Sequence, residues 1–250
     1  IALRIRLAVG VASVVIGLVA AEGLTRLADG GALPHLALFV ERPDGSVTLS
    51  PGSTQKLAGV AGPYGVETDA EGCRRGGAGV GWLVVGDSQV LGMGVPGDAT
   101  FSAVGGHRNC GVPGHGVVDA AARARALVAP DTAGVLVVVN QANDWDEGLK
   151  PATARYDVVG GRLIRTASSG ALGRAFWSSP APRSHLLYYV AMLAMAVSRT
   201  DDPAPGWLTD PGGQQPTTVA LAGVADALAT QLAPTPVVVA FLPVDVAADE

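Results

Sequence analysis

Three short apolar runs, each of β-strand length, constrain the fold of this chain more than any other feature. The runs are Trp82–Val85, Val135–Val139 and Val237–Leu242. Unbroken apolar runs of this length are typical of strands that are covered on both faces. Segments with a helical pattern, residues 117–129 and 217–232, precede the second and third runs. This order of strands and helices predicts an α/β protein with a parallel sheet and helices on both faces.

Composition limits the class of protein further. Hydrophobic residues make up 48% of the chain and charged residues 16%, which excludes a disordered protein. The net charge of -5 provides no basic face, so we expect no binding to nucleic acid. The histidines and cysteines do not have the spacing of metal ligands, and no metal or other cofactor is expected.

An apolar segment near the N-terminus predicts targeting to a membrane. Two arginines precede an uncharged run over residues 7–21, and Glu22 and Arg26 follow it. Positive charge before an apolar run is the pattern of a signal anchor or a signal peptide. We expect residues 1–28 to anchor the protein in the inner membrane, with the rest of the chain extracytoplasmic. A cleaved signal peptide of a secreted or periplasmic protein and a buried helix of a soluble protein are the alternatives.

The remainder of the chain divides into a lead-in and a main domain. Residues 29–80 are rich in Gly, Pro, Asp, Ser and Thr, which predicts a stalk and an irregular lead-in. The main domain covers residues 81–250 and has an insertion over residues 146–216. Within the insertion, two glycines at 160–161 predict a β-hairpin, and residues 184–199 an apolar helix. This helix is interpreted as a core helix, a lid, a wall of the substrate cleft or a second membrane contact.

The two cysteines, Cys73 and Cys110, have two interpretations. A compartment outside the cytoplasm permits a disulfide between them. Free cysteines are also among the most buried side chains in proteins, so two small core residues are the alternative. The sequence alone leaves both interpretations open.

Polar residues that follow the apolar runs are the candidates for chemistry, because ligands bind at the carboxyl ends of the strands in open parallel sheets. Ser88 follows the first run, at the turn from strand to helix. Gly111 lies in a glycine-rich segment over residues 109–116, and Asn143 follows the second run. Taken singly, each is equally a turn or a helix cap. Together they predict that Ser88 attacks an acyl carbonyl, while the N–H groups of Ser88 and Gly111 and the Asn143 amide hold the oxyanion.

The order and context of these residues resemble the SGNH, or GDSL-type, hydrolase family. Gly86-Asp87-Ser88 resembles the family's first block, which carries the nucleophile, and Gly111 and Asn143-Asp144 resemble its second and third blocks. Gln141 stands where the third block of the family has glycine. The resemblance covers about residues 80–145 well and the last apolar run loosely. It implies a flavodoxin-like, three-layer parallel sheet with an N-terminal transmembrane or signal helix, similar to membrane-anchored envelope members of the family.

The family's catalytic base lies in an Asp-x-x-His motif near the C-terminus, and this chain has no such motif. His115 lies in the segment that resembles the second block, and the two interpretations are a histidine that lines the pocket and an ordinary loop residue. His35 and His185 are not expected to act as the base. A serine without a base is a poor nucleophile, so we expect the chain to be truncated before this motif.

The leading hypothesis is therefore a serine ester hydrolase, or an acyl or acetyl transferase, at the cell envelope. Its expected substrate is an acylated small molecule, lipid or polysaccharide, with water or a sugar hydroxyl as the acceptor. The alternative is a non-catalytic, tethered carbohydrate-binding or assembly protein on the same fold, which Gln141 and the missing base favour. A nucleotide binder is disfavoured, because no phosphate-binding glycine motif and no basic residue lies near residues 86–94.

Overall fold

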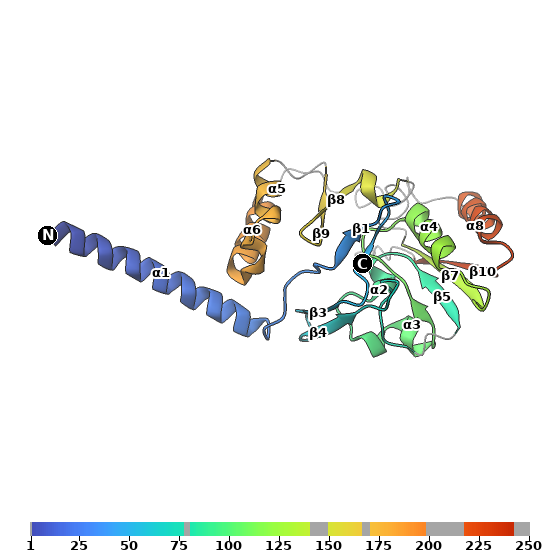
Figure 1. Cartoon of the computed structure of the whole chain (residues 1–250), viewed down its shortest axis with the longest axis horizontal. Helices are drawn as coiled ribbons and strands as arrows, with labels where there is room; N and C mark the ends of the chain where they lie inside the picture. The colour runs from blue at the N-terminus through green and yellow to red at the C-terminus, as the bar shows by residue number, and fades with distance from the viewer. Residues whose placement is uncertain (1, 78–80, 141–149, 167–170, 199–217, 243–250) are drawn as a thin grey trace, which may run out of the picture.

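The computed structural model describes residues 2–77, 81–140, 150–166, 171–198 and 218–242. The chain is a mixed α/β protein, as predicted, with a central sheet of four parallel strands and one long apolar helix at the N-terminus (Figure 1). Its helices are α1 (Ala2–Ala28), α2 (Ser88–Leu91), α3 (Phe101–Val104), α4 (Val117–Leu127), α5 (Ala171–Ser178), α6 (His185–Ser198) and α8 (Thr218–Leu232). Its strands are β1 (Phe39–Glu41), β2 (Val47–Leu49), β3 (Thr54–Leu57), β4 (Tyr64–Glu67), β5 (Trp82–Val85), β6 (Arg108–Asn109), β7 (Gly134–Asn140), β8 (Tyr156–Val159), β9 (Arg162–Arg165) and β10 (Val237–Leu242).

The central sheet has the strand order β10-β7-β5-β6, and every neighbouring pair is parallel. The three apolar runs supply β5, β7 and β10, so the prediction of parallel strands is confirmed for them. β7 lies between the other two: Val85 pairs with Val137, and Phe241 pairs with Val139. The fourth strand, β6, has only two residues, which is too short for a periodic sequence signal.

The strands bury alternate side chains on two faces. On one face Leu83, Val85, Val135 and Val137 form a core with α4 and α8. On the other face Val84 and Val138 contact Val90 of α2. The described residues therefore cover this second face near β5 but leave it open at β10, where Val238 is 47% exposed. Helices were predicted on both faces of the sheet. Among the described residues, α4 and α8 cover one face, whereas only the short helix α2 contacts the other.

Residues 29–80, expected as a stalk and irregular lead-in, contain two antiparallel pairs, β1–β2 and β3–β4. Their side chains have a core of their own, which includes Phe39, Leu49 and Val66. Leu91 and Val112, from the segments around Ser88 and Gly111, belong to the same core. The lead-in is thus packed directly against the candidate site.

The insertion contains the predicted hairpin and the predicted apolar helix. β8 and β9 pair antiparallel around Gly160 and Gly161, which have φ angles of 56° and 78°. These left-handed conformations are required at both central residues of a two-residue type I′ turn, and glycine adopts them without strain. Figure 1 shows β8, β9, α5 and α6 between α1 and the parallel sheet.

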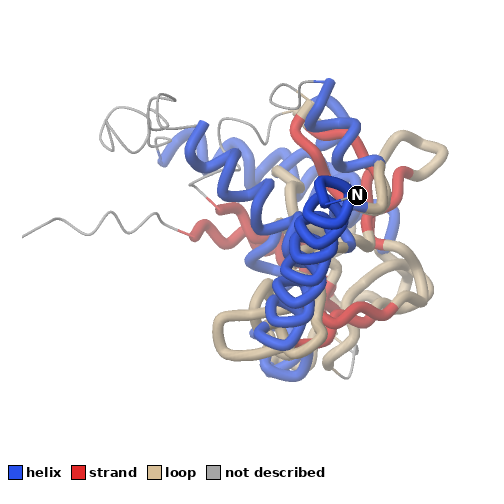
Figure 2. The backbone as a smooth tube through the Cα atoms, turned by 90° about the vertical axis from the view of Figure 1, so that its left-hand side faces the viewer, coloured by secondary structure: helices blue, strands red, loops and turns tan. Residues whose placement is uncertain are grey.

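Helix α1 projects away from the rest of the molecule (Figures 1 and 2). Its segment Val9–Ala28 is the one span among the described residues that is long and apolar enough to cross a membrane, and none of it is buried. A helix of twenty residues is about 30 Å long, the thickness of the hydrocarbon core of a bilayer. A signal sequence near the N-terminus has the same length and composition.

Candidate functional site

Ser88 lies at the carboxyl end of β5, as predicted, and is the first residue of α2. The turn between strand and helix is tight at Gly86: a Cβ atom there would lie 2.6 Å from the carbonyl oxygen of Val138 and 2.6 Å from Cγ2 of Val90. Ser88 itself is half-buried, and no hydrogen bond joins its Oγ to any described residue. Among the described residues its hydroxyl therefore has no hydrogen-bond partner. It lies at the carboxyl ends of the strands, where ligands bind in open parallel sheets.

Asp87 shapes the turn that presents Ser88. Its side chain is 1% exposed, and Oδ1 accepts a hydrogen bond from the backbone N–H of Gln89 at 2.8 Å. This is an N-terminal cap, which satisfies one of the free N–H groups of the first helical turn. Oδ2 is buried and has no hydrogen-bond partner. A buried carboxylate oxygen without a donor is costly, and the hydrogen bond of Oδ1 offsets only part of the cost of burying this side chain.

Gly111 lies beside this turn. The parallel ladder of β5 and β6 continues past the strands, since Cys110 donates to the carbonyl of Val84 at 2.8 Å and Val112 donates to that of Gly86 at 2.9 Å. A Cβ atom on Gly111 would lie 2.5 Å from the backbone nitrogen of Leu91. The backbone of Gly111 therefore contacts α2 directly, in a place where no other residue fits.

Asn109 bridges the two segments, a role that sequence reasoning missed. Its side chain is buried: Nδ2 donates to the carbonyl of Val90 at 2.7 Å, and Oδ1 accepts from the N–H of Gly111 at 3.2 Å. The N–H that was expected to hold an oxyanion thus has a long, weak internal partner. A substrate oxygen must compete with Asn109 for it. The one signal in the sequence was an amide side chain two residues before this glycine.

The third predicted residue, Asn143, lies outside the described residues. β7, the strand that precedes it, is parallel to β5 and ends at Asn140. The chain therefore leaves β7 at the same edge of the sheet that carries Ser88 and Gly111.

Arg74 holds α2 from behind. Its guanidinium is 4% exposed and donates from Nη1 to the carbonyls of Leu91 and Gly92, at 2.6 and 2.7 Å. Nη2 donates to the carbonyls of Gly65 and Val95, at 2.9 and 2.6 Å. Cations near a helix C-terminus satisfy its free carbonyl groups, and burial lowers the pKa of Arg74. No sequence signal identified this arginine, because its burial depends on how the lead-in packs.

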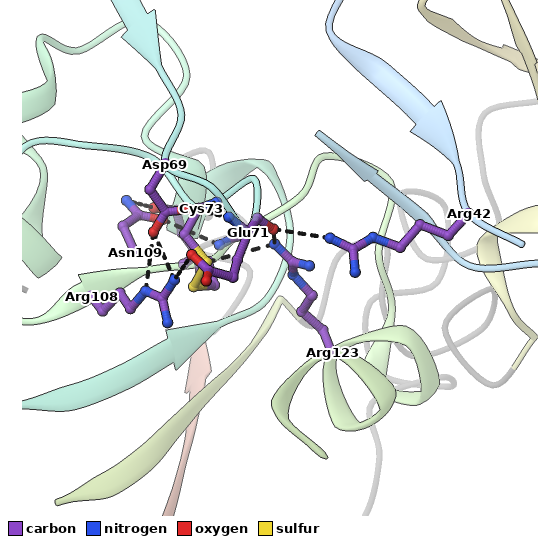
Figure 3. Close-up of a disulfide and its surroundings, with 10 residues drawn as sticks. Arg42, Asp69, Glu71, Cys73, Arg108, Asn109 and Arg123 are labelled. Carbon is purple, nitrogen blue, oxygen red and sulfur yellow. Dashed lines mark hydrogen bonds and ion pairs between the residues drawn. A yellow bond between two sulfur atoms is a disulfide. The ribbon is translucent and has the colours of Figure 1, made fainter. Parts of the chain in front are cut away.

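A disulfide joins Cys73 to Cys110, which resolves the two interpretations of the cysteines (Figure 3). Both cysteines are fully buried. The bond ties the lead-in to the residue immediately before Gly111. Within the described residues, the position of Gly111 is thus determined by the disulfide, by Asn109 and by the parallel ladder.

Charged side chains surround the disulfide. Figure 3 shows Arg108 between the carboxylates of Asp69 and Glu71, at 2.7 and 2.8 Å. Burial raises the pKa of Asp69, but the hydrogen bond and charge of Arg108 and two backbone N–H groups outweigh it and lower the pKa. Arg123 donates to the carbonyl of Glu71 at 2.6 Å, and burial lowers its pKa to about 10. None of these side chains is hydrogen-bonded to Ser88, so we interpret their contacts as structural.

His115 is not available to Ser88. Its side chain is 3% exposed, and Nε2 is hydrogen-bonded at 2.8 Å to the carbonyl of Val47 in the lead-in. Burial lowers the pKa of His115, so the imidazole is neutral and Nε2 donates this bond. The expectation that His115 lines a pocket is therefore replaced by a structural role between β2 and the segment over residues 109–116.

The other histidines also lie away from Ser88. His107 directly precedes β6 and approaches Gly81, which directly precedes β5, so it lies at the amino end of the sheet. His35 and His185 contact residues of the insertion and of α1. No described histidine is hydrogen-bonded to Ser88. No group of three or more potential metal ligands is present among the described residues.

Comparison of the chain with models of protein families, with curated proteins and with solved structures finds no match.

Proposed function

We propose that the protein is a serine ester hydrolase, or an acyl or acetyl transferase, that acts at the cell envelope on the flavodoxin-like, three-layer fold of the SGNH type. One observation carries the proposal. A half-exposed serine with an unengaged hydroxyl lies at the carboxyl end of β5, and the backbone of Gly111 lies against the helix that this serine begins. A serine and a backbone N–H donor beside it are two of the groups that nucleophilic attack on an acyl group requires, and a base is the third.

In this proposal Ser88 Oγ attacks the carbonyl carbon of an ester, and the negative charge develops on the carbonyl oxygen. The N–H groups of Ser88 and Gly111 and the amide of Asn143 stabilise that charge, each worth roughly 3 kcal/mol of the barrier. The proton of Ser88 passes to a base other than the described histidines. The C–O bond of the ester then breaks, and the alcohol leaves with this proton while the acyl group stays on Ser88 Oγ. Water or a sugar hydroxyl attacks the acyl-serine in turn and takes the acyl group, and its proton passes through the same base back to Ser88 Oγ. The substrate is an acylated small molecule, lipid or polysaccharide.

The proposed compartment is outside the cytoplasm, with α1 as the anchor in the inner membrane. Two observations support it. Helix α1 has the length and composition of a membrane span. The only two cysteines form a disulfide, and disulfides persist in oxidising compartments.

A second candidate function is a tethered, non-catalytic binder of acylated carbohydrate on the same fold. Two features of the proposed catalytic groups favour it: the lack of a base among the described histidines and the paired N–H of Gly111. Ser88 has no hydrogen bond to any described histidine, and the N–H of Gly111 is paired with Asn109. In this candidate the edge of the sheet near Ser88 binds the acyl group without cleaving it.

The test measures the hydrolysis of p-nitrophenyl acetate by the wild type, by Ser88→Ala and by Ser178→Ala. Ser178 is an exposed serine on α5 and serves as the matched control. We expect Ser88→Ala to fall to the rate of buffer, Asn143→Ala to lose about 100-fold in turnover, and Ser178→Ala to equal the wild type.

Covalent labelling provides the second readout. A fluorophosphonate is expected to modify Ser88, as identified by peptide mass spectrometry, and to leave Ser178 unmodified. Equal rates for wild type and Ser88→Ala, with no labelling, would reject the enzyme. Binding of an acetylated oligosaccharide that Ser88→Ala leaves unchanged would then support the binder.

A further inference from the structure

Helix α6 is strongly apolar yet lies on the surface. Its sequence, HLLYYVAMLAMAVS, contains no Asp, Glu, Lys or Arg. Its fourteen residues are too few to cross a bilayer, which takes about 20. A short apolar helix in a soluble protein is expected to be buried in the core.

The exposed side chains of α6 form a stripe. Leu187 is 45% exposed, Val190 54% and Leu193 66%, and residues at a spacing of three lie on one side of a helix. Tyr189 and Met192 extend the same exposed surface. On its protein side α6 contacts α1, and Tyr188 stacks on the ring of His35 at 4.8 Å between centroids. One side of the helix is therefore held by protein, while no described residue covers its apolar stripe.

Helix α6 begins at the C-terminal end of α1. The carboxylate of Glu22 accepts hydrogen bonds from Ser184 Oγ at 2.8 Å and from the backbone N–H of Leu186 at 3.0 Å. Glu22 thus caps the first turn of α6, where free N–H groups attract negative charge. Asp29 is paired with the ring of His185 and accepts from the hydroxyl of Tyr189 at 2.8 Å.

This junction lies at the last turns of the apolar span of α1. Residues 9–20 of α1 are all exposed, so α6 does not run along them. The polar contacts with the start of α6 come from Glu22 and Asp29, and Arg26 donates to the carbonyl of Arg183, two residues before α6. Charged residues at the end of an apolar span lie at the boundary between lipid and water. The start of α6 is therefore at that boundary whenever α1 spans a membrane.

We propose that α6 lies in the interfacial layer of the bilayer that α1 spans, with the stripe of Leu187, Val190 and Leu193 in contact with lipid. The proposal rests on the anchoring role that the proposed function gives to α1. The occupant is lipid because the exposed apolar surfaces of the two helices meet at one junction. Tyrosine is enriched at membrane interfaces, and Tyr189 lies at this junction.

The consequence is a fixed orientation of the sheet relative to the membrane. A single anchor allows the attached domain to rotate, whereas an anchor and an interfacial helix joined by several hydrogen bonds do not. From α6 the contacts continue inward, since His35, stacked on Tyr188, accepts a hydrogen bond from Arg162 Nε at 2.6 Å. Arg162 is the first residue of β9. α6 is thereby connected to the hairpin that lies between α1 and the sheet.

Depth-dependent fluorescence quenching in phospholipid vesicles tests the proposal on the full chain. The native cysteines are both in the disulfide, so a single introduced cysteine is the one free thiol. Val190→Cys and Leu193→Cys report on α6, Ile16→Cys reports on α1, and Val104→Cys on α3 is the aqueous control. All four side chains are exposed, so the changes leave the packing intact. Each is labelled with a nitrobenzoxadiazole dye, in vesicles whose lipids carry a quencher near the headgroup or near the end of the acyl chain.

We expect the labels at 190 and 193 to be quenched most by the headgroup-proximal quencher, the label at 16 most by the deep quencher, and the label at 104 by neither. One outcome would overturn the placement of α6 but not the anchor: the label at 16 is quenched, while the labels at 190 and 193 are not. In that outcome the emission of the labels at 190 and 193 has the same long wavelength as that of the aqueous control at 104. Blue-shifted but unquenched labels at 190 and 193 would mean that protein covers the stripe, a second copy or another partner, and would also overturn it. Absence of quenching at 16 would reject the anchor itself and, with it, the placement of α6.

Discussion

At the scale of single residues, buried polar side chains do most of the positioning around Ser88. Arg74 binds four backbone carbonyls, Asn109 bridges α2 and Gly111, and His115 bonds the carbonyl of Val47. Each is a long or charged side chain whose burial is paid for by hydrogen bonds. The position of Ser88 therefore depends on buried polar side chains, and protonation of one of them, His115, is expected to destabilise the fold.

His115 makes the stability of the protein depend on pH. Burial lowers its pKa in the folded state, while the unfolded chain has the ordinary value of about 6.5. Between these two values the unfolded chain binds more protons, so stability present above about pH 6.5 is lost as the pH falls. His35 acts in the same direction, since burial and the charge of Arg162 lower its pKa to about 4. We expect the free energy of unfolding in urea, followed by tryptophan fluorescence, to decrease from about pH 7 to about pH 5.

The control for this prediction is His115→Gln, whose amide can donate to the carbonyl of Val47 without titrating. We expect the dependence on pH in this range to become shallower in the variant. Asp44 and Asp69, the described carboxyl groups outside α1 with a lowered pKa, contribute mainly below about pH 5 and do not account for a change between pH 5 and pH 7. An unchanged slope in His115→Gln would show that the imidazole is not kept neutral by the fold.

At the scale of elements, the site depends on the contact between α2 and the segment after β6. The lead-in, α2 and this segment share one core, and the disulfide joins the lead-in to Cys110. Cross-linking residues 37 positions apart reduces the freedom of the unfolded chain and is worth about 3–4 kcal/mol. The elements around Ser88 are thus held together from the lead-in side as well as by the sheet.

The close contact of Gly111 with α2 gives a prediction at this scale. Gly111→Ala places a methyl group 2.5 Å from the nitrogen of Leu91, so backbone must move. We expect the free energy of unfolding, measured by thermal denaturation, to fall by about 1–3 kcal/mol. The Ser88-dependent rate of hydrolysis is also expected to fall, because α2 carries the serine. Gly65→Ala is the matched control, since its Cβ would meet nothing within 4 Å. Equal melting temperatures of the two variants would contradict the contact.

At the scale of the whole molecule, an apolar helix without any buried span is attached to a domain with an internal disulfide. Both features agree with the proposed location, because disulfides persist in oxidising compartments outside the cytoplasm. Helix α6 adds a second exposed apolar surface. In the proposed arrangement α1 and α6 form the end of the molecule that faces the membrane.

The redox state of the cysteines tests this arrangement in cells. We expect Cys73 and Cys110 of the full chain to resist alkylation by a polyethylene-glycol maleimide in denaturant, and to react only after reduction. A variant without residues 1–28 stays in the cytoplasm, and its cysteines are expected to react directly. Band shifts on a gel measure both states. Reactive thiols in the full chain would place the domain in the cytoplasm.

Much of the fold followed from local sequence patterns. The apolar runs at β5, β7 and β10, the helices α4, α6 and α8 and the hairpin β8–β9 all have signals within a few residues of their positions. The position of Ser88 at the end of β5 followed from the same reasoning, because strand and helix meet there in sequence. Each of these features depends on neighbours along the chain, which is why periodicity and turn residues were sufficient.

The sequence by itself thus determined the parallel α/β architecture, the apolar N-terminal helix and the serine at a strand end. Only the tertiary structure decided that Cys73 bonds to Cys110, that Arg74 and Asn109 hold α2, and that His115 is committed to Val47. The disulfide, Arg74 and His115 join the lead-in to the main domain, and the strands of the lead-in are too short to give a periodic signal. Asn109 belongs to β6, a strand of only two residues. Burial of a polar side chain depends on what packs over it, and that packing partner is distant in the sequence.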